Sequence, residues 1–325
     1  MEEILRLFPD SIRKAINSTI NGRWALLQEI RFRLYQPVEL IFDHKMEWIS
    51  TIKPNKKDGI FIVNQLSEFS LYRMEDELRE GYITIEGGHR VGLAGKVNTK
   101  QGVVKALQHI TFLNIRIAKE KLGCAKPIMP YIYKGDYMNT LFVGAPQTGK
   151  TTMIRDAARL VATGWGGVEA RKVAIIDERS EIAGSIKGVP QHDLGLRADV
   201  MDACPKAEGM MMMIRSMSPD VLIVDEIGSN RDVQALMEAI NAGVIVMCTI
   251  HGNTLSDLKK RPSLNVLFQQ EIFKRIVIFQ KHVNPGKIKH IYNQREENIL
   301  EKSRCLPDEV DRSTSFHRHN HLDRV

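Results

Sequence analysis

The sequence predicts an α/β protein whose mostly parallel sheet is preceded by a smaller α+β domain. From Asn139 onward, short apolar runs alternate with amphipathic helical patterns, as in the βαβ units of a parallel sheet. Before Asn139, segments of alternating polarity and a Gly-Gly turn indicate strands and a hairpin mixed with helices. The 325 residues suit about two domains, and the 43% hydrophobic and 26% charged content is ordinary for globular proteins.

The first domain is expected over residues 1–137. Its predicted elements are a helix within Glu2–Ile16, a strand at Glu29–Leu34, a helix at Gln65–Arg79, a hairpin over Tyr82–Val97 and a strand at Phe112–Ile117. Proline and glycine punctuate Lys126–Tyr137, which we interpret as the linker at the end of this domain.

The second domain is expected over residues 138–293. Its predicted strands are Thr140–Val143, Val173–Ile176, Val221–Val224 and Val244–Thr249, with Arg275–Phe279 and Lys287–Tyr292 as candidates to complete the sheet. Helical patterns cover Thr151–Val161 and Asp232–Asn241. The remaining residues, 294–325, are polar and non-periodic, so we expect this tail to be disordered.

Composition restricts the functional class. The four cysteines form no CxxC pair, which argues against a disulfide scaffold or a zinc finger. No apolar run approaches the roughly 18 residues of a membrane span, and the acidic N-terminus does not resemble a signal peptide. We therefore expect a cytoplasmic protein. The net charge of +7 favours an anionic partner, and most of it lies in residues 1–139, which hold 21 basic and 16 acidic side chains.

One segment, GAPQTGKT from Gly144 to Thr151, matches the phosphate-binding pattern GxxxxGK[ST]. It follows a predicted strand and opens a predicted helix, which is the context that the pattern requires. The residues expected to bind ATP are Gly144, Ala145, Pro146, Gln147, Thr148, Gly149, Lys150, Thr151 and Thr152. Lys150 would reach the β- and γ-phosphates, and the Thr151 hydroxyl would help to hold Mg²⁺.

Two acids follow the apolar run Val221–Val224. At the carboxyl end of a strand in the same sheet, Asp225 would enter the Mg²⁺ shell and Glu226 could polarise the attacking water. Nucleotide binding alone does not need the second acid, so the presence of Glu226 favours an enzyme that hydrolyses ATP over a protein that only binds it.

Two further strand ends carry ionisable side chains. Asp177 and Glu178 follow Val173–Ile176, and either could complete the metal and water site if their strand lies beside the one that ends at Asp225. His251 ends another strand, where its hydrogen bonding could sense the γ-phosphate. We include all three among the candidate catalytic residues.

These four blocks, in this order, resemble the type II and type IV secretion ATPases and pilus-retraction ATPases, with their phosphate loop, Asp box, acidic strand and His box. The matching residues of the acidic strand are Pro219, Asp220, Glu226 and Ile227. Asp225 stands where the family often has glycine, the first two acids of the Asp box are interchanged, and Val244 replaces an earlier histidine of the His box. The resemblance implies a RecA-like P-loop ATPase domain.

A closer resemblance is to sporulation members of this family in endospore-forming bacteria. It rests on DERSEIAGS from Asp177, GVPQHDLGLR from Gly188, VDEIGS from Val224 and GGHRVGLAGK from Gly87. It implies an ATP hydrolase that forms a homo-hexamer and associates peripherally with the cytoplasmic face of the mother-cell membrane around the forespore. There it would power or assemble a channel made by membrane proteins of the sporulation complex.

The resemblance also implies arginines that act on a neighbouring subunit's nucleotide. In such rings the N-terminal domain supplies them, and Arg90 and Arg116 lie on predicted strands of that domain. They are the candidates for this role in trans.

Two other functions are left open. A nucleic-acid-dependent ring ATPase would use the basic first domain, but aromatic residues are only 6% of the chain, so nucleic acid is not the expected partner. The second alternative is a nucleotide-gated scaffold that does not hydrolyse ATP. The intact pair Asp225–Glu226 argues against this function.

Overall fold

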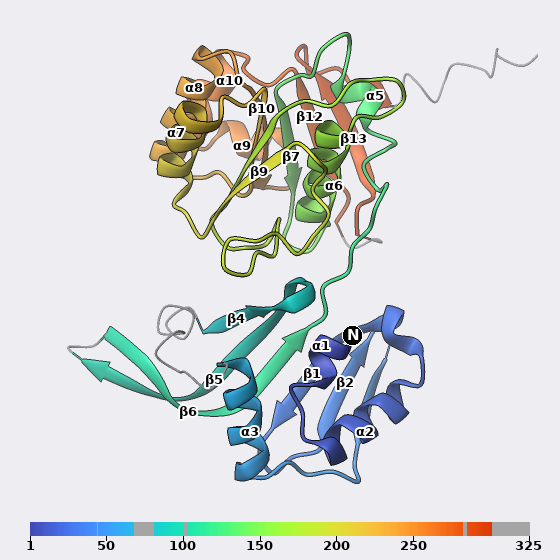
Figure 1. Ribbon diagram of the computed structural model, residues 1–325. Coiled ribbons are helices and arrows are strands. Elements are labelled where there is room, and N and C mark those ends of the chain that lie inside the picture. The colour runs from blue at the N-terminus through green and yellow to red at the C-terminus, as the bar shows by residue number, and fades with distance from the viewer. Residues whose placement is uncertain (44, 68–80, 101–102, 282–284, 301–325) are drawn as a thin grey trace, which may run out of the picture.

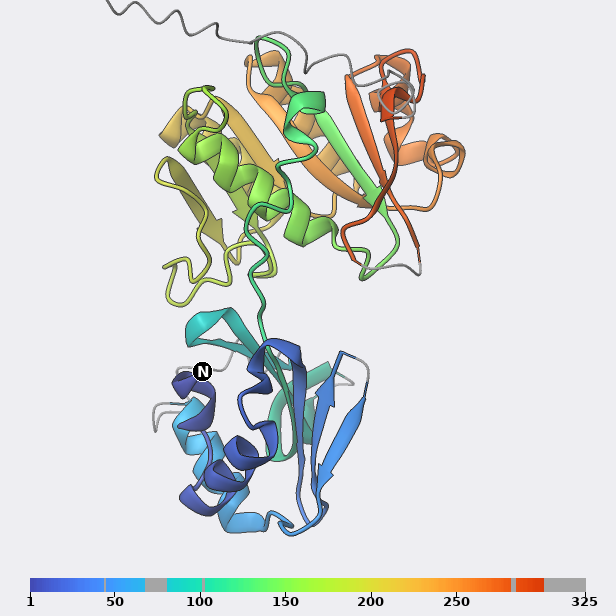
Figure 2. The same cartoon turned by 90° about the vertical axis from the view of Figure 1, so that its right-hand side faces the viewer.

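The computed structural model describes residues 1–300 except 44, 68–80, 101–102 and 282–284. It contains two sheets, one in each half of the chain, and each has its own hydrophobic core (Figures 1 and 2). Most of the predicted helix Gln65–Arg79 and most of the predicted tail lie outside the described residues. Among the described helices, none combines the length and apolar character needed to cross a bilayer.

The first sheet has six strands in the order β3-β2-β1-β6-β5-β4, and its neighbouring strands are antiparallel. The elements of this half are α1 (Glu2–Leu5), α2 (Asp10–Ile20), β1 (Leu27–Arg33), β2 (Val38–Phe42), β3 (Met46–Ile49), α3 (Lys56–Leu66), β4 (Tyr82–Ile85), β5 (His89–Lys100) and β6 (Val103–Arg116). The predicted hairpin is confirmed, because β4 and β5 pair across the turn at Glu86–Gly88. The helical segment expected within Glu2–Ile16 is two helices, because Pro9 caps the start of α2.

The second sheet has seven strands in the order β13-β12-β7-β11-β10-β8-β9. The elements of this half are α5 (Met129–Ile132), β7 (Thr140–Gly144), α6 (Lys150–Thr163), β8 (Val173–Asp177), β9 (Ala198–Asp202), α7 (Lys206–Met217), β10 (Val221–Val224), α8 (Asn230–Asn241), β11 (Ile245–His251), α9 (Leu255–Lys259), α10 (Asn265–Gln269), β12 (Arg275–Phe279) and β13 (Ile288–Asn293). All pairs are parallel except β12 with β13. The predicted α/β class is confirmed.

The edge strand β9 was not predicted. Its sequence, ADVMD, interleaves two acids with apolar residues, and all five residues are only half-buried because β9 has a neighbour on one side alone. Such a strand lacks the continuous apolar run that marks the interior strands.

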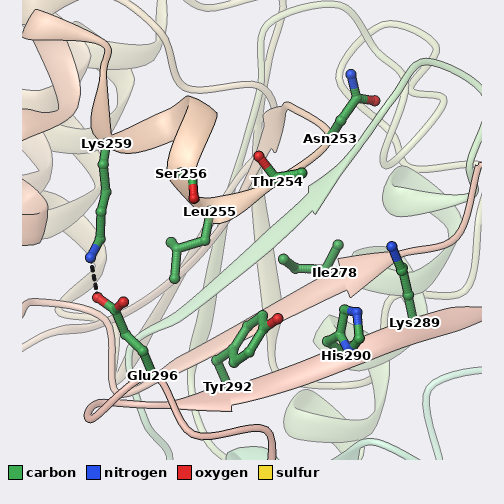
Figure 3. A pocket seen from close by; sticks show the side chains of 10 residues that line it. All are labelled: Asn253, Thr254, Leu255, Ser256, Lys259, Ile278, Lys289, His290, Tyr292 and Glu296. Atoms are coloured by element: carbon green, nitrogen blue, oxygen red, sulfur yellow. Dashed lines mark hydrogen bonds and ion pairs between the residues drawn. The ribbon is translucent and has the colours of Figure 1, made fainter.

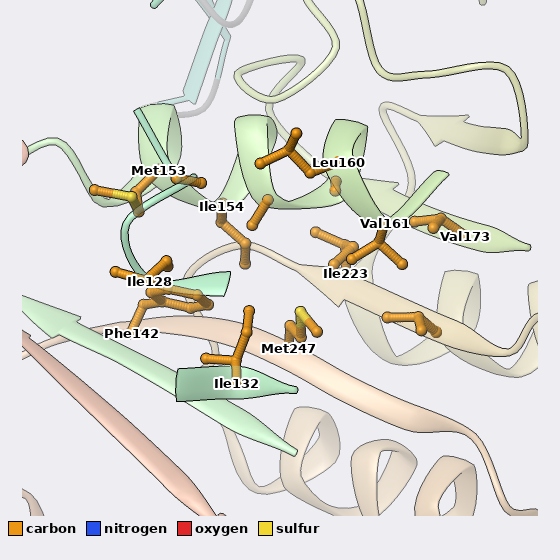
Figure 4. Close-up of a cluster of buried hydrophobic side chains, with 14 of the residues drawn as sticks. Ile128, Ile132, Phe142, Met153, Ile154, Leu160, Val161, Val173, Ile223 and Met247 are labelled. Carbon is orange, nitrogen blue, oxygen red and sulfur yellow. The ribbon is translucent and has the colours of Figure 1, made fainter. Parts of the chain in front are cut away.

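Helices cover both faces of the second sheet. On one face, Ile154 and Leu160 of α6 pack with Phe142 and Ile223 from the strands (Figure 4). The alternate strand residues point to the other face, where they meet α7, α8 and α10 in a second buried cluster. In the methionine run of α7, Met210 and Met213 are buried in that cluster, whereas Met212 is exposed.

The segment Lys126–Tyr137 is not a free linker. Ile128 and Ile132 pack beside Phe142 in the second core, and Tyr137 is also buried (Figure 4). The second of its two prolines and its glycine mark a short helix and a turn within the packed structure, since Pro130 lies in the first turn of α5 and Gly135 has a positive φ. The chain passes between the two halves earlier, just after β6.

One buried carboxylate anchors this crossing. Asp156 of α6 accepts hydrogen bonds from the backbone N–H groups of Gly123 (3.0 Å) and Ala125 (2.7 Å), and it forms an ion pair with Arg159. The connecting chain is thus attached directly to the helix that begins at the phosphate-binding pattern.

Candidate functional site

Two glycines bound the loop between β7 and α6, and each lies where a side chain would meet a close neighbour. Gly149 has a φ of +88°, and a Cβ there would lie 2.6 Å from the backbone nitrogen of Gly286. A Cβ on Gly144 would lie 2.4 Å from Oγ1 of Thr148. The pattern GxxxxGK[ST] therefore has a steric reason at both glycine positions.

The residues of this loop differ in exposure. Thr148 is buried and donates its hydroxyl hydrogen bond to the Ala145 carbonyl at 2.8 Å, whereas Pro146 and Gln147 are exposed. Thr152, on the first turn of α6, is half-buried, and its carbonyl faces Sγ of Cys124. The exposed loop tip and the start of α6 thus lie where an anion can approach backbone N–H groups.

Lys150 is buried at the base of the loop. Its Nζ donates to the Ala145 carbonyl at 3.0 Å and lies 3.2 Å from Nδ1 of His251. Burial lowers the pKa of Lys150, although the charges of Asp225, Glu226 and Glu181 oppose this shift. These acids keep the ammonium group favourable in a site where burial alone would disfavour it.

The strand order brings three strand ends together. β11 lies between β7 and β10, His251 is level with Gly144, and Cys248 is level with Val224. The carboxyl ends of parallel strands share one edge of the sheet, so His251 lies between the phosphate-binding loop and Asp225.

Asp225 connects the acidic strand to the loop. Its Oδ2 accepts a hydrogen bond from Oγ1 of Thr151 at 2.9 Å, and its Oδ1 accepts one from the Thr249 hydroxyl. A hydroxyl and a carboxylate oxygen are the ligands that Mg²⁺ prefers, and Mg²⁺ is commonly held by one or two protein groups together with phosphates and water. The oxygens of Thr151 and Asp225 therefore fit the metal expected with ATP.

Both carboxylate oxygens of Glu226 have side-chain partners. Oε1 lies 2.6 Å from Nε2 of His251, and Oε2 lies 3.2 Å from Nη1 of Arg179. A lysine ammonium can only donate, so Nδ1 of His251 accepts from Lys150 and Nε2 donates to Glu226. The three side chains form a continuous Lys150–His251–Glu226 series, a connection that the separate motifs did not reveal.

The strand that carries Asp177 lies directly beside β10, as the sequence hypothesis required, with Ile176 level with Val224. The Asp177 carboxylate accepts backbone hydrogen bonds from Glu181 (2.8 Å), Ile182 (3.0 Å) and Ala183 (2.8 Å). Burial raises its pKa to about 6, although these bonds oppose the shift. With its oxygens occupied in this way, Asp177 holds the loop after β8.

Glu178 has a different environment. It is an exposed side chain that pairs with Lys206, and it lines a small cavity together with Asp225 and Glu226. Asp177 lines the same cavity, but its oxygens already accept three backbone hydrogen bonds, whereas the Glu178 carboxylate has a side-chain partner, Lys206.

The two candidate arginines lie on neighbouring strands of the first sheet, where Arg90 of β5 is level with Arg116 of β6. Arg90 forms an ion pair at 2.8 Å with Glu181 of the same chain, beside the Asp177 loop. Arg116 is exposed, and its Nε lies 3.7 Å from Oε1 of Glu29.

A separate surface pocket of about 350 Å³ lies between the segment after β11 and strands β12 and β13 (Figure 3). An ion pair between Lys259 and Glu296 lies at one end, and His290 and Tyr292 line the β13 side. None of the predicted site residues lines this pocket.

Comparison with known sequences gives the family. The sequence profile described as "Sporulation stage III, protein AA" matches residues 1–299. The chain belongs to this family. It is 48% identical over 303 residues to the stage III sporulation protein AA of Bacillus subtilis (strain 168), covering 93% of this chain and 98% of that protein. It is also 26% identical to the uncharacterized protein ycf45 of Porphyra purpurea over 266 residues, which are 81% of this chain and 43% of that protein.

Solved structures show the fold of this sporulation family member. The Legionella pneumophila ATPase DotB superposes with a TM-score of 0.59 at 14% identity, covering 94% of this chain and 86% of that one. The pilus retraction motor PilT with bound ADP superposes with a TM-score of 0.57 at 15% identity, covering 81% of this chain and 77% of that one. The predicted RecA-like secretion-ATPase fold is therefore confirmed.

Proposed function

We propose that this protein hydrolyses ATP at the edge of the second sheet. The contact between Thr151 and Asp225 carries the proposal, because it joins the phosphate-binding loop to the acidic strand at the point where Mg²⁺ would be held. Glu226 follows Asp225 directly, and its carboxylate is only partly exposed. The fold shared with DotB and PilT supports a nucleotide-dependent function.

The roles of the chain's own residues follow from their placement. The loop N–H groups and Lys150 bind the phosphates of ATP, and Lys150 exchanges its contact with His251 for one with the γ-phosphate. Glu226 orients the attacking water and accepts its proton. Thr151 and Asp225 would hold Mg²⁺, which would supply positive charge to offset the charge that develops on the phosphates.

We further propose that the enzyme works as a homo-hexamer that powers or assembles a membrane channel during sporulation. Membership of the sporulation family and the secretion-ATPase fold support this part of the proposal. The site would lie on the cytoplasmic face of the mother-cell membrane around the forespore. Arg116 is the stronger candidate for acting on a neighbour's nucleotide, because it is more exposed than Arg90 and its ion pair with Glu29, at 3.7 Å, is longer than the 2.8 Å pair of Arg90 with Glu181.

Steady-state turnover of Mg²⁺-ATP, measured across protein concentration, tests the proposal. Specific activity should rise with assembly, and Lys150→Ala should lower it by at least ~100-fold, since removing one preorganised donor to a developing charge costs about 10²–10³ in rate. Lys260→Ala, at an exposed lysine of the same half, is the matched control. Equal rates for Lys150→Ala and the parent chain would refute ATP hydrolysis at this site.

The same assay separates the two other functions. Strong stimulation by DNA or RNA with steep salt dependence would favour a nucleic-acid-dependent motor. ATP binding without turnover in the assembled protein would favour a nucleotide-gated scaffold.

A further inference from the structure

We propose that Arg179 is a positioning residue for Glu226, and that the first sheet of the same subunit holds Arg179 in place through Tyr82 and Arg90. The inference rests on the proposed role of Glu226 in hydrolysis. It adds a residue and a connection between the two halves that no motif indicates.

Arg179 contacts the candidate catalytic carboxylate from the neighbouring strand end. Its Nη1 lies 3.2 Å from Oε2 of Glu226, while His251 lies on Oε1. Glu226 has a φ of +52°, so its backbone adopts the left-handed region that a glutamate seldom occupies. Two side-chain partners, one on each oxygen, restrict the direction in which this carboxylate points.

The loop that carries Arg179 is held by side chains of β8 and α6. Asp177 accepts three of its backbone N–H groups, and Arg155 of α6 donates to the carbonyls of Glu181 and Ile182, each at 2.5 Å. These bonds fix the backbone that follows the turn at Ser180, which itself has a positive φ, and they tie it to Asp177 at the end of β8. The Arg179 side chain is 61% exposed, so packing does little to hold the guanidinium, whose placement depends on the position of the Arg179 backbone and on the ion pair with Glu226.

The first sheet contacts this loop at two residues, Arg179 and Glu181, on either side of Ser180. The Tyr82 hydroxyl of β4 donates to the Arg179 carbonyl at 3.5 Å, and Arg90 of β5 forms its ion pair with Glu181 at 2.8 Å. The Arg90 guanidinium also lies 3.4 Å from the centroid of the Tyr82 ring, so the two side chains brace each other. Tyr82 and Arg90 form one clamp on the loop.

A second set of hydrogen bonds joins the first half of the chain to residues 191 and 192 of the second half. The backbone N–H of Gly87 donates to Oε1 of Gln191 at 3.3 Å, and Oε1 of Glu120 lies 3.0 Å from Nδ1 of the buried His192. The clamp therefore belongs to a wider interface. A rotation of the first sheet that breaks this interface would release the loop and, with it, one of the two side chains that hold Glu226.

The kinetic test compares Arg179→Ala with Arg179→Lys and the control Arg171→Ala, an exposed arginine paired with Asp136. Arg179→Ala should lower kcat by ~10–100-fold with KM and the binding of a fluorescent ATP analogue unchanged, because misplacing a catalytic group by about 1 Å can cost 10²-fold. Arg179→Lys should recover part of the loss, and Arg171→Ala should have no effect. Unchanged kcat in Arg179→Ala, with turnover abolished in Glu226→Gln, would overturn the positioning role alone.

A measurement without nucleotide tests the clamp independently of catalysis. In the full chain, Arg90→Ala should speed amide hydrogen exchange of residues 178–183 by at least several-fold, whereas Arg6→Ala, which removes an ion pair within the first half, should not. Exchange in that loop equal to the parent chain would overturn the clamp. Absence of ATP turnover in every variant and in the parent chain would refute the proposed function. The exchange rates of residues 178–183 would still show whether Tyr82 and Arg90 hold the loop.

Discussion

Thr151 and Asp225 are 74 positions apart in the sequence, yet Oγ1 of the first donates a hydrogen bond to Oδ2 of the second at 2.9 Å. One lies at the start of the helix after the phosphate-binding loop, and the other ends the acidic strand. The contact arises although a third strand, β11, separates β7 from β10 in the sheet. The site is therefore assembled across three strand ends, with His251 on the middle one.

Thr151→Ala should raise the Mg²⁺ concentration needed for half-maximal ATP turnover by roughly ten-fold or more, because the variant loses one of the two oxygens that fit the metal. Thr151→Ser keeps the hydroxyl and should retain most of the activity. A magnesium titration of turnover measures this shift. An unchanged titration in Thr151→Ala would remove the threonine from the metal site.

Glu226→Gln should lower kcat by about 10²–10⁴, the usual contribution of a general base, while ATP still binds. Filter binding should then show ATP retained on the variant, where the parent chain releases ADP. Glu238→Gln, at an exposed position of α8, serves as the control. Normal turnover in Glu226→Gln would assign the base to another residue.

Asp177 predicts a specific pH dependence of stability. Its pKa is raised to about 6 by burial, above the value of 3.8 for a free aspartate, so between these pH values the folded protein keeps a proton that the unfolded chain has lost. This group's contribution to stability therefore declines as the pH rises through that window, by about 3 kcal/mol for a shift of roughly two units.

The melting temperature of the parent chain relative to Asp177→Asn should accordingly fall between pH 4 and pH 6, because asparagine does not titrate. Asn also lacks one acceptor oxygen, so the variant should be less stable at all pH values in this range. An advantage of the parent chain that grows with pH would mean that the three backbone hydrogen bonds outweigh burial.

Asp156→Ala should destabilise the second half of the protein by about 3–5 kcal/mol, since the substitution removes the acceptor of the buried Ala125 N–H and of the partly buried Gly123 N–H and Arg159 guanidinium. Asp10→Ala removes an exposed ion pair with Arg13 and should cost no more than ~1 kcal/mol. Denaturant unfolding followed by circular dichroism measures both. Similar losses in the two variants would contradict the anchoring role of Asp156.

Gly95→Ala should weaken the pairing of β5 with β6, because a Cβ at this position would lie 1.7 Å from the His109 carbonyl oxygen. Gly92, on the same strand, has ordinary space, with its nearest neighbour at 3.7 Å. Gly95→Ala should therefore lower the melting temperature by several degrees, as expected for a loss of about 1–3 kcal/mol, and Gly92→Ala should change it little. A melting temperature of Gly95→Ala equal to that of the parent chain would show that the strand shifts to accept the methyl group.

The interior strands of the second sheet were predictable because each is a continuous apolar run bounded by polar residues, a pattern imposed by burial on both faces. The edge strand β9 and the packed segment Lys126–Tyr137 were not. Strand β9 carries charged residues at a half-buried edge of the sheet. The segment Lys126–Tyr137 contains two prolines and a glycine, residues that are equally common in a linker and in a tight turn.

The sequence by itself indicated the phosphate-binding loop and the acids after the strands, because the pattern GxxxxGK[ST] and the pair Asp225–Glu226 are each formed by residues that are neighbours in the chain. Only the tertiary structure decided which side chains meet. Strand order is set by packing between segments far apart in the chain, so it alone placed His251 between Lys150 and Glu226, and Asp177 beside the acidic strand. The contact of Arg179 with Glu226 has the same origin, since it depends on β8 lying next to β10 and on a clamp from the other sheet.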